Sequence, residues 1–133
     1  MTENNRKFDL EERTSRFAQR VRDFCLKLPK NQANHEFVPQ LIRSGSSPGA
    51  NYIEANEGIG GKDFIMKIKT CRREAKESGY WLNLVMTDGS TTAEEERAAL
   101  KQEAREFVLI FTAILKKKGE SLRRTVFLLL III

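Results

Sequence analysis

The sequence predicts an all-α protein, an up-down antiparallel four-helix bundle. Four segments place apolar residues at steps of three and four, which is the spacing of amphipathic helices. No segment alternates apolar and polar residues with a period of two, and 133 residues are the length of one domain with a real core. We expect the bundle to occupy residues 9–118, after an N-terminal arm (1–8) and before a C-terminal extension with an apolar tail (119–133).

The first two predicted helices lie on either side of a proline. The first runs from about Asp9 to Leu28, and Pro29 ends it. Its apolar seam comprises Leu10, Phe17, Val21, Phe24 and Leu28. The second helix starts near Asn34, with Pro39 in its first turn, where a missing N–H is tolerated.

Residues 43–58, RSGSSPGANYIEANEG, are predicted to continue the second helix. Their small side chains would let a neighbour approach closely, and Tyr80 and Trp81 of the third helix are the expected neighbours. Pro48 is expected to kink the helix near Ser44, with serine hydroxyls bonding to the freed carbonyls. A phosphate-binding loop would need a lysine and a preceding strand, and neither occurs here.

The third predicted helix, over about residues 62–86, has the most regular seam. This seam comprises Phe64, Ile68, Cys71, Ala75, Ser78, Leu82 and Val85. After a turn over residues 87–92, Thr92 is expected to cap the fourth helix, which ends before Gly119. The seam of the fourth helix comprises Leu100, Ala104, Phe107, Phe111 and Ile114.

A signature runs through the second and third helices. Its residues are Arg43, Ser44, Ser47, Gly49, Ala50, Asn51, Glu54, Tyr80 and Trp81. In order and spacing they resemble the bacterial four-helix-bundle family of the 23S rRNA intervening-sequence protein, over roughly residues 7–118. That family is similar to the accessory variability protein of diversity-generating retroelements. The resemblance implies a pentameric homo-oligomer with a basic surface that works with a reverse transcriptase and RNA.

Basic residues gather on faces of the first and third predicted helices and again over residues 116–124, and the chain carries a net charge of +5. The candidate nucleic-acid-binding residues are Arg13, Arg16, Arg20, Lys69, Arg72, Arg73 and Lys76. The alternative is an ordinary solvated surface with glutamates as intrahelical partners, and the pattern does not choose between them. For the polar signature residues we favour ion pairs between helices or subunits over a ligand site. For Tyr80 and Trp81 we favour packing over base stacking, one ring against the second helix and the other toward the first helix or a neighbouring subunit.

The sequence predicts no catalytic site, metal site or cofactor. A di-iron bundle needs Glu-x-x-His on two helices, and His35 is the only histidine. No nucleophile elbow occurs, and Cys25 and Cys71 are expected to be buried and reduced. The N-terminus lacks the apolar core of a signal peptide, and residues 126–133 are too few to span a membrane.

These observations favour a cytoplasmic, non-enzymatic oligomer that binds RNA or DNA as an accessory to a nucleic-acid-processing partner. A structural adaptor that joins proteins, with no nucleic-acid binding, is the alternative. Salt dependence would distinguish the two, since contacts to phosphates weaken steeply with added salt.

Overall fold

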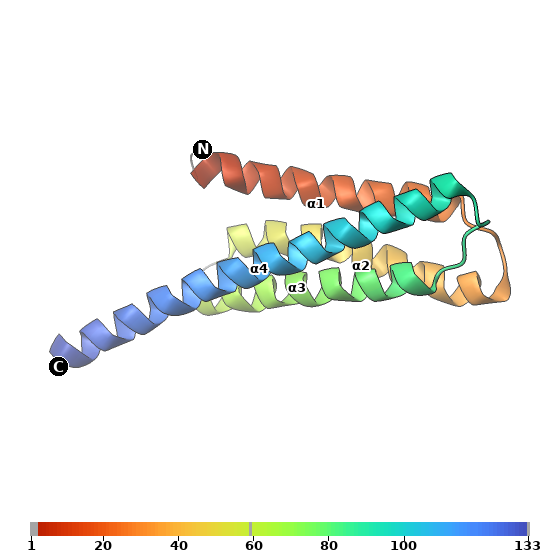
Figure 1. Ribbon diagram of the computed structural model, residues 1–133. Coiled ribbons are helices and arrows are strands. Elements are labelled where there is room, and N and C mark those ends of the chain that lie inside the picture. The colour runs from red at the N-terminus through yellow and green to blue at the C-terminus, as the bar shows by residue number, and fades with distance from the viewer. Residues whose placement is uncertain (1–2, 59, 133) are drawn as a thin grey trace.

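Four long helices lie side by side and alternate in direction (Figure 1). The computed structural model describes residues 3–58 and 60–132, with the side chains of residues 10–58, 60–120 and 123–132. The helices are α1 (Glu3–Leu26), α2 (Gln32–Glu57), α3 (Gly61–Leu84) and α4 (Thr91–Ile132). The described residues form no strand, and the predicted all-α four-helix bundle is confirmed.

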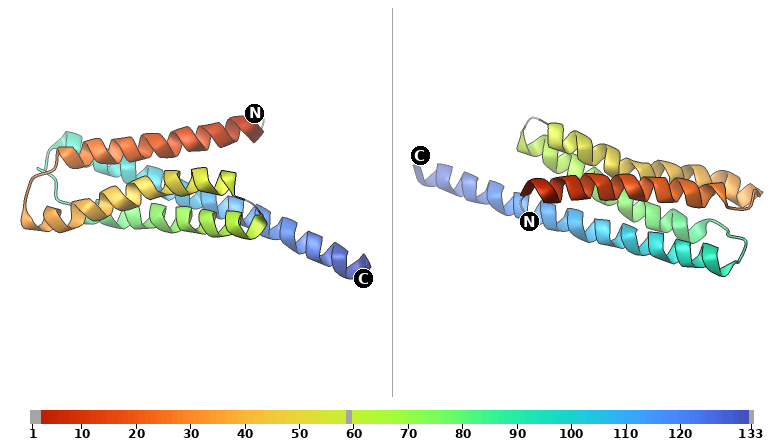
Figure 2. Two further views of the ribbon diagram at one scale, coloured as in Figure 1. Left: turned by 180° about the vertical axis from the view of Figure 1, so that it is seen from behind. Right: turned by 90° about the horizontal axis from the view of Figure 1, so that it is seen from above.

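Each helix packs against its neighbours in the chain. α2 lies between α1 and α3, and α4 packs against α3 along most of the bundle. α4 also meets α1, over a smaller contact that closes the bundle. The views from behind and from above in Figure 2 show the same arrangement, with the last turns of α4 projecting beyond the other three helices.

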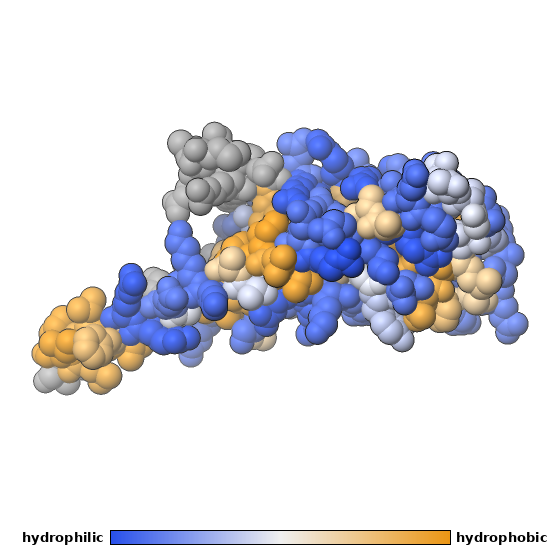
Figure 3. Space-filling model, in the orientation of Figure 1, coloured by the Kyte–Doolittle hydropathy of each residue, from blue (hydrophilic) through white to orange (hydrophobic). Residues whose placement is uncertain are grey.

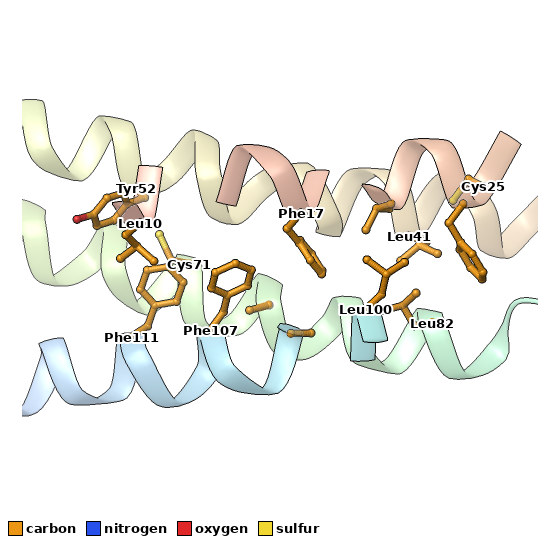
Figure 4. Close-up of a cluster of buried hydrophobic side chains, with 14 of the residues drawn as sticks. Leu10, Phe17, Cys25, Leu41, Tyr52, Cys71, Leu82, Leu100, Phe107 and Phe111 are labelled. Carbon is orange, nitrogen blue, oxygen red and sulfur yellow. The ribbon is translucent and has the colours of Figure 1, made fainter. Parts of the chain in front are cut away.

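One apolar core runs along the centre of the bundle, and all four helices contribute to it (Figure 4). The rings of Phe17 and Phe107 meet edge to face, with their centroids 5.3 Å apart. Leu41, Leu82 and Leu100 are fully buried between the helices. Each such side chain contributes about 1.5–3 kcal/mol through burial. The predicted seams therefore form the core, with Phe64 and Ile114 only half-buried.

The glycines of α2 allow a close approach, as predicted, but the neighbour is α1. A Cβ atom on Gly45 would lie 3.0 Å from Val21 Cγ1. A Cβ atom on Gly49 would lie 3.2 Å from Thr14 Oγ1. Since both distances are tighter than ordinary van der Waals contact, any larger residue would push α1 and α2 apart.

The predicted packing of Tyr80 and Trp81 against these glycines is wrong. Trp81 packs instead against Phe37 in the first half of α2, with ring centroids 5.9 Å apart. The side chain of Tyr80 points outward and is 59% exposed. The sequence does show which faces of α2 and α3 are apolar or small, but not which face meets which helix.

α2 continues without interruption through two prolines. It begins at Gln32, so Pro39 lies inside the helix rather than in its first turn as predicted. Pro48 has no backbone N–H, so the carbonyl of Ser44 does not accept the usual helical hydrogen bond from it. The hydroxyls of Ser44 and Ser46 donate to other carbonyls of the preceding turn, those of Leu41, Ile42 and Arg43. The kink predicted near Ser44 stays a prediction.

Two helix starts differ from the predicted ones. α1 begins at Glu3, so most of the predicted arm over residues 1–8 is helical; residues 1 and 2 lie outside the described residues. At the start of α4, the hydroxyl of Ser90 accepts a hydrogen bond from the N–H of Ala93 at 3.2 Å. Ser90 therefore caps this helix, and Thr92 lies inside it.

α4 does not end at Gly119, and this part of the prediction is wrong. The helix continues to Ile132 as 42 residues, about 63 Å at 1.5 Å per residue. Gly119 keeps helical geometry; the described glycines with a positive φ are Gly60, between α2 and α3, and Gly89, between α3 and α4. The segment predicted as a separate extension is thus a direct continuation of a bundle helix up to Ile132.

Candidate nucleic-acid interface

Arg13, the first candidate cation, lies in the seam between α1 and α4. It forms ion pairs with Glu103 at 2.5 Å and with Glu106 at 3.0 Å, both on α4. Its guanidinium also lies over the ring of Phe107, 5.4 Å from the centroid. The hydrogen bond from Arg13 lowers the pKa of Glu103 below its ordinary value. These contacts hold two helices together, so the charge of Arg13 is largely neutralised within the protein.

The other two candidate arginines of α1 are also paired. Arg20 reaches Glu96 of α4 at 3.3 Å, in the same seam as Arg13. Arg16 is exposed and pairs with Glu12 one turn earlier, at 2.7 Å. Because nearby carboxylates balance all three arginines, α1 presents a weaker positive surface than its sequence indicates.

The four candidate cations of α3 lie on its outward side. Lys69, Arg73 and Lys76 are exposed, and Arg72 is half-buried. Arg73 has one carboxylate nearby, that of Glu74 at 3.7 Å. Among the described residues, no carboxylate forms an ion pair with Lys69, Arg72 or Lys76. This side of α3 therefore keeps most of its positive charge.

Two cations of α4, Lys101 and Arg105, extend this positive surface. Lys101 donates to the amide oxygen of Asn83 at 3.0 Å, and Arg105 donates to the amide oxygen of Gln102 at 2.8 Å. Both partners are neutral, so the charges remain. A groove of about 470 Å³ between α3 and α4 is lined by Lys76, Gly79, Lys101 and Arg105, among others.

We call this surface the α3/α4 basic face. Its cations are Lys69, Arg72, Arg73, Lys76, Lys101 and Arg105. Only the α3 members are among the cations that the sequence predicts. The spacing of four between Lys101 and Arg105 shows that they share one side of α4, but nothing in the spacing shows that this side adjoins α3.

Tyr80 adds an exposed aromatic ring to the α3/α4 basic face. It lies one turn after Lys76 and two turns after Arg73 on the same side of α3. Its ring meets the ring of Trp81 edge-on, with centroids 5.0 Å apart, and this contact restricts the movement of Tyr80 on one side. Packing of Tyr80 inside the bundle is therefore wrong, and packing against a neighbouring subunit stays a prediction. Gly79 leaves open space beside it, since a Cβ atom there would have nothing within 4 Å.

Arg43, the first residue of the family signature, joins α2 to α3. It pairs with Glu74 at 2.9 Å and also with Glu77. The indole N–H of Trp81 donates to the same carboxylate of Glu77 at 3.0 Å. Burial opposes the charge of Arg43, but the hydrogen bond and the charge of Glu74, with those of Glu77, raise its pKa above the ordinary value. This network stabilises the register of two helices.

The other polar signature residues also make local or interhelical contacts. Glu54 of α2 pairs with Lys67 of α3 at 2.6 Å, and this hydrogen bond raises the pKa of Lys67. The amide of Asn51 donates to the carbonyl and the hydroxyl of Ser47, at 3.0 and 2.9 Å. Of the small members, Ser44 is buried, Gly49 faces α1 and Ala50 is exposed. The signature thus describes how α2 packs, not a ligand pocket.

The thiols are poorly placed for chemistry. Cys25 and Cys71 are free and buried. Burial raises the pKa of Cys25 to about 11 and that of Cys71 to about 12, so neither thiol ionises readily. No group of three or more potential metal ligands occurs within the described part of the chain. None of the helices in that part is long and apolar enough to cross a membrane.

Comparisons with known proteins agree with the fold. Residues 6–113 match the model of a family described as 23S rRNA-intervening sequence protein. A crystal structure from Bacteroides thetaiotaomicron VPI-5482, described as a protein with unknown function from the S23 ribosomal protein family, superposes with a TM-score of 0.72 at 29% identity. That match covers 83% of this chain and 97% of the other. No curated protein matches the chain significantly. The family match stops before the projecting end of α4.

Proposed function

Since the chain belongs to the 23S rRNA-intervening sequence protein family, we propose that its bundle is a non-enzymatic module that binds single-stranded nucleic acid, RNA or DNA, through the α3/α4 basic face. The observation that carries the proposal is the uneven pairing of charge. The three candidate arginines of α1 are balanced by carboxylates, whereas Lys69, Arg72 and Lys76 have no ion-pair partner among the described residues. Of the two helices that carry the predicted cations, α3 is therefore the one that offers a polyanion a positive surface.

Electrostatics supplies most of the affinity in this proposal. A phosphate backbone releases bound counterions when it meets Lys and Arg side chains, and binding weakens as salt is added. With about five phosphate contacts to a single strand, affinity should fall about a hundredfold between 50 and 200 mM salt. A contact made mainly by apolar burial would change little over this range.

The exposed ring of Tyr80 favours a single-stranded ligand over a duplex. An exposed aromatic ring among cations can stack on an unpaired base, which contributes about 1–3 kcal/mol and requires no particular sequence. A duplex keeps its bases stacked on each other, so it could use only the phosphate contacts. The groove of the α3/α4 basic face, lined by Gly79 and Lys76, gives room for a further base or a sugar of the same strand.

Charge reversal on the α3/α4 basic face tests the proposal. A variant with Lys69→Glu, Arg72→Glu and Lys76→Glu should lose single-stranded binding at physiological salt while its helicity stays unchanged. The matched control reverses three exposed cations elsewhere, Arg22, Lys27 and Lys30, and so changes the net charge by the same amount. It should weaken binding only slightly. Equal affinities of the two variants would refute the proposed face.

We further propose that the chain assembles as a homo-oligomer through α2. Ile42 and Ile53 are exposed on the outward side of α2, with exposed Ser46 and Ala50 between them. This stripe of apolar and small residues suits a second copy of the chain, and the number five comes from the family resemblance. Light scattering should give the mass of an oligomer, and Ile42→Glu should reduce it to that of a monomer.

The α2 stripe also favours the second candidate function, an adaptor that joins proteins. A reverse transcriptase or another nucleic-acid-processing protein is the partner that the resemblance indicates. If the purified protein is an oligomer without nucleic acid, and if added salt does not weaken its binding to other protein chains, the adaptor is the better description. If nuclease removes absorbance at 260 nm from the oligomer, the nucleic-acid function is supported.

A further inference from the structure

The projecting end of α4 carries a set of apolar side chains that nothing in the described structure covers. We call residues 126–132 the apolar tail; its members are Val126, Phe127, Leu128, Leu129, Leu130, Ile131 and Ile132. Each is between 54% and 79% exposed. In Figure 3 they form the orange end of the molecule, beyond the blue segment that precedes them. Such a continuous apolar surface on a protein marks an interaction site.

The apolar tail is apolar on every side of the helix. Successive residues of an α-helix are turned by about 100°, so seven consecutive apolar residues surround the axis. A partner helix in a coiled coil covers only a stripe that repeats every 3.5 residues. It would leave the opposite side of the apolar tail in water. A helix that is apolar all round fits surroundings that are apolar all round, and lipid acyl chains provide them.

Five exposed cations precede the apolar tail on several sides of α4. Arg123 and Arg124 lie within its preceding turn, and Lys116, Lys117 and Lys118 lie about two turns earlier, all of them exposed. Against these five cations, residues 116–132 contain one carboxylate, that of Glu120. Lys118 also lies over the ring of Phe64, which fixes this part of α4 to the bundle. This basic collar is complementary to anionic lipid headgroups.

We propose that the apolar tail inserts into one leaflet of an anionic bilayer, with Arg123 and Arg124 at the level of the headgroups. Seven residues rise about 10 Å, which fits within one leaflet and is far less than a bilayer core of about 30 Å. The insertion is therefore shallow and does not span the membrane. Stable attachment takes two signals, and the apolar tail with its basic collar supplies both. The proposal stands independently of nucleic-acid binding.

Flotation of the nuclease-treated full chain with lipid vesicles tests this proposal. The chain should float with vesicles that contain phosphatidylglycerol and only weakly with phosphatidylcholine alone. Leu130→Glu should abolish flotation. Leu109→Glu is the matched control, because Leu109 lies on the same helix and is also 69% exposed, but within the bundle. The double variant Arg123→Gln, Arg124→Gln should bind phosphatidylglycerol vesicles about thirtyfold more weakly, which is about fivefold for each cation removed.

Three results would overturn the proposal. The first is that the full chain does not float with phosphatidylglycerol vesicles. The second is that Leu130→Glu and Leu109→Glu float equally. The third is that reversal of Lys69, Arg72 and Lys76 abolishes flotation while Leu130→Glu does not, which would assign the lipid contact to the α3/α4 basic face. If the chain fails to float and light scattering shows a larger oligomer that Leu130→Glu dissociates, the apolar tail binds a second copy instead.

Discussion

Replacing Gly45 by alanine should destabilise the bundle, although alanine is the better helix former. The added Cβ atom would lie 3.0 Å from Val21 Cγ1 and 3.1 Å from Val21 Cγ2. Val21 cannot easily yield, because it is buried and a β-branched side chain in a helix has one preferred rotamer. The helices α1 and α2 must then separate slightly along their contact.

The size of the effect follows from two opposing contributions. Overpacking of a tight core costs about 1–3 kcal/mol. The better helix propensity of alanine returns about 1 kcal/mol. Gly45→Ala should therefore lower the free energy of unfolding by up to about 2 kcal/mol. Gly79→Ala is the matched control, since its Cβ atom meets nothing within 4 Å and only the favourable contribution of about 1 kcal/mol remains.

Urea denaturation followed by circular dichroism measures both variants. We expect Gly79→Ala to be more stable than the wild type and Gly45→Ala to be less stable, with about 1–3 kcal/mol between them. In a Val21→Ala background the two Cγ atoms are absent and only the Cβ atom of residue 21, 3.3 Å away, remains, so Gly45→Ala should be less destabilising. If Gly45→Ala and Gly79→Ala have equal stability, or if Gly45→Ala costs as much in the Val21→Ala background as in the wild type, the proposed close contact of α1 with α2 is refuted.

Three further predictions concern charge, thiols and the exposed ring. Because the hydrogen bond from Arg13 lowers the pKa of Glu103, this pair stabilises the bundle above the unfolded pKa of about 4.3, and the contribution is lost as pH falls through the folded pKa. Glu103→Gln should reduce the free energy of unfolding by about 1 kcal/mol at pH 7, and this free energy should then fall less steeply as the pH is lowered. The same steepness in the variant and the wild type would contradict this. Cys25 and Cys71 should react with iodoacetamide at pH 8 at least about a hundredfold more slowly in the native chain than in urea; equal rates would contradict their burial. Tyr80→Ala should weaken single-stranded binding about fivefold to a hundredfold without loss of stability, whereas Tyr80→Phe should not; equal loss in both variants would exclude stacking.

Apolar spacing predicted the buried side of each helix because burial depends on the position of a residue around its own helix axis. Phe17, Val21, Phe107 and Phe111 are buried for this reason. The spacing does not show which helix packs against which face of another helix. Gly45 could have packed against α1 or α3, and only the assembled bundle shows that it contacts Val21.

The candidate site was predicted only in part for the same reason. Glu103 lies 90 residues from Arg13 in the chain, so no local pattern shows that it neutralises this arginine. Lys101 and Arg105 join the cations of α3 only because α4 packs beside that helix. Tyr80 and Trp81 are adjacent in sequence and about 100° apart around the helix, and which of the two is exposed depends on the position of Phe37.

The end of α4 was predicted wrongly because a single glycine is weak evidence for a helix terminus. One glycine inside a helix costs about 1 kcal/mol relative to alanine. The residues on either side of Gly119, Lys118 and Glu120 among them, are good helix formers. A terminus also needs a residue in the left-handed conformation or another cap, and Gly119 does not adopt that conformation.

The unbroken helix through Gly119 has a mechanical consequence. α4 carries Lys101 and Arg105 at the groove and Val126 at the start of its uncovered end. Arg105 and Val126 are separated by about 32 Å along one axis, at 1.5 Å per residue. A helix transmits rotation and displacement along its length, so neither region can turn without the other. A partner that binds the end of α4 therefore also fixes how far the groove lies from that partner and which way the groove faces.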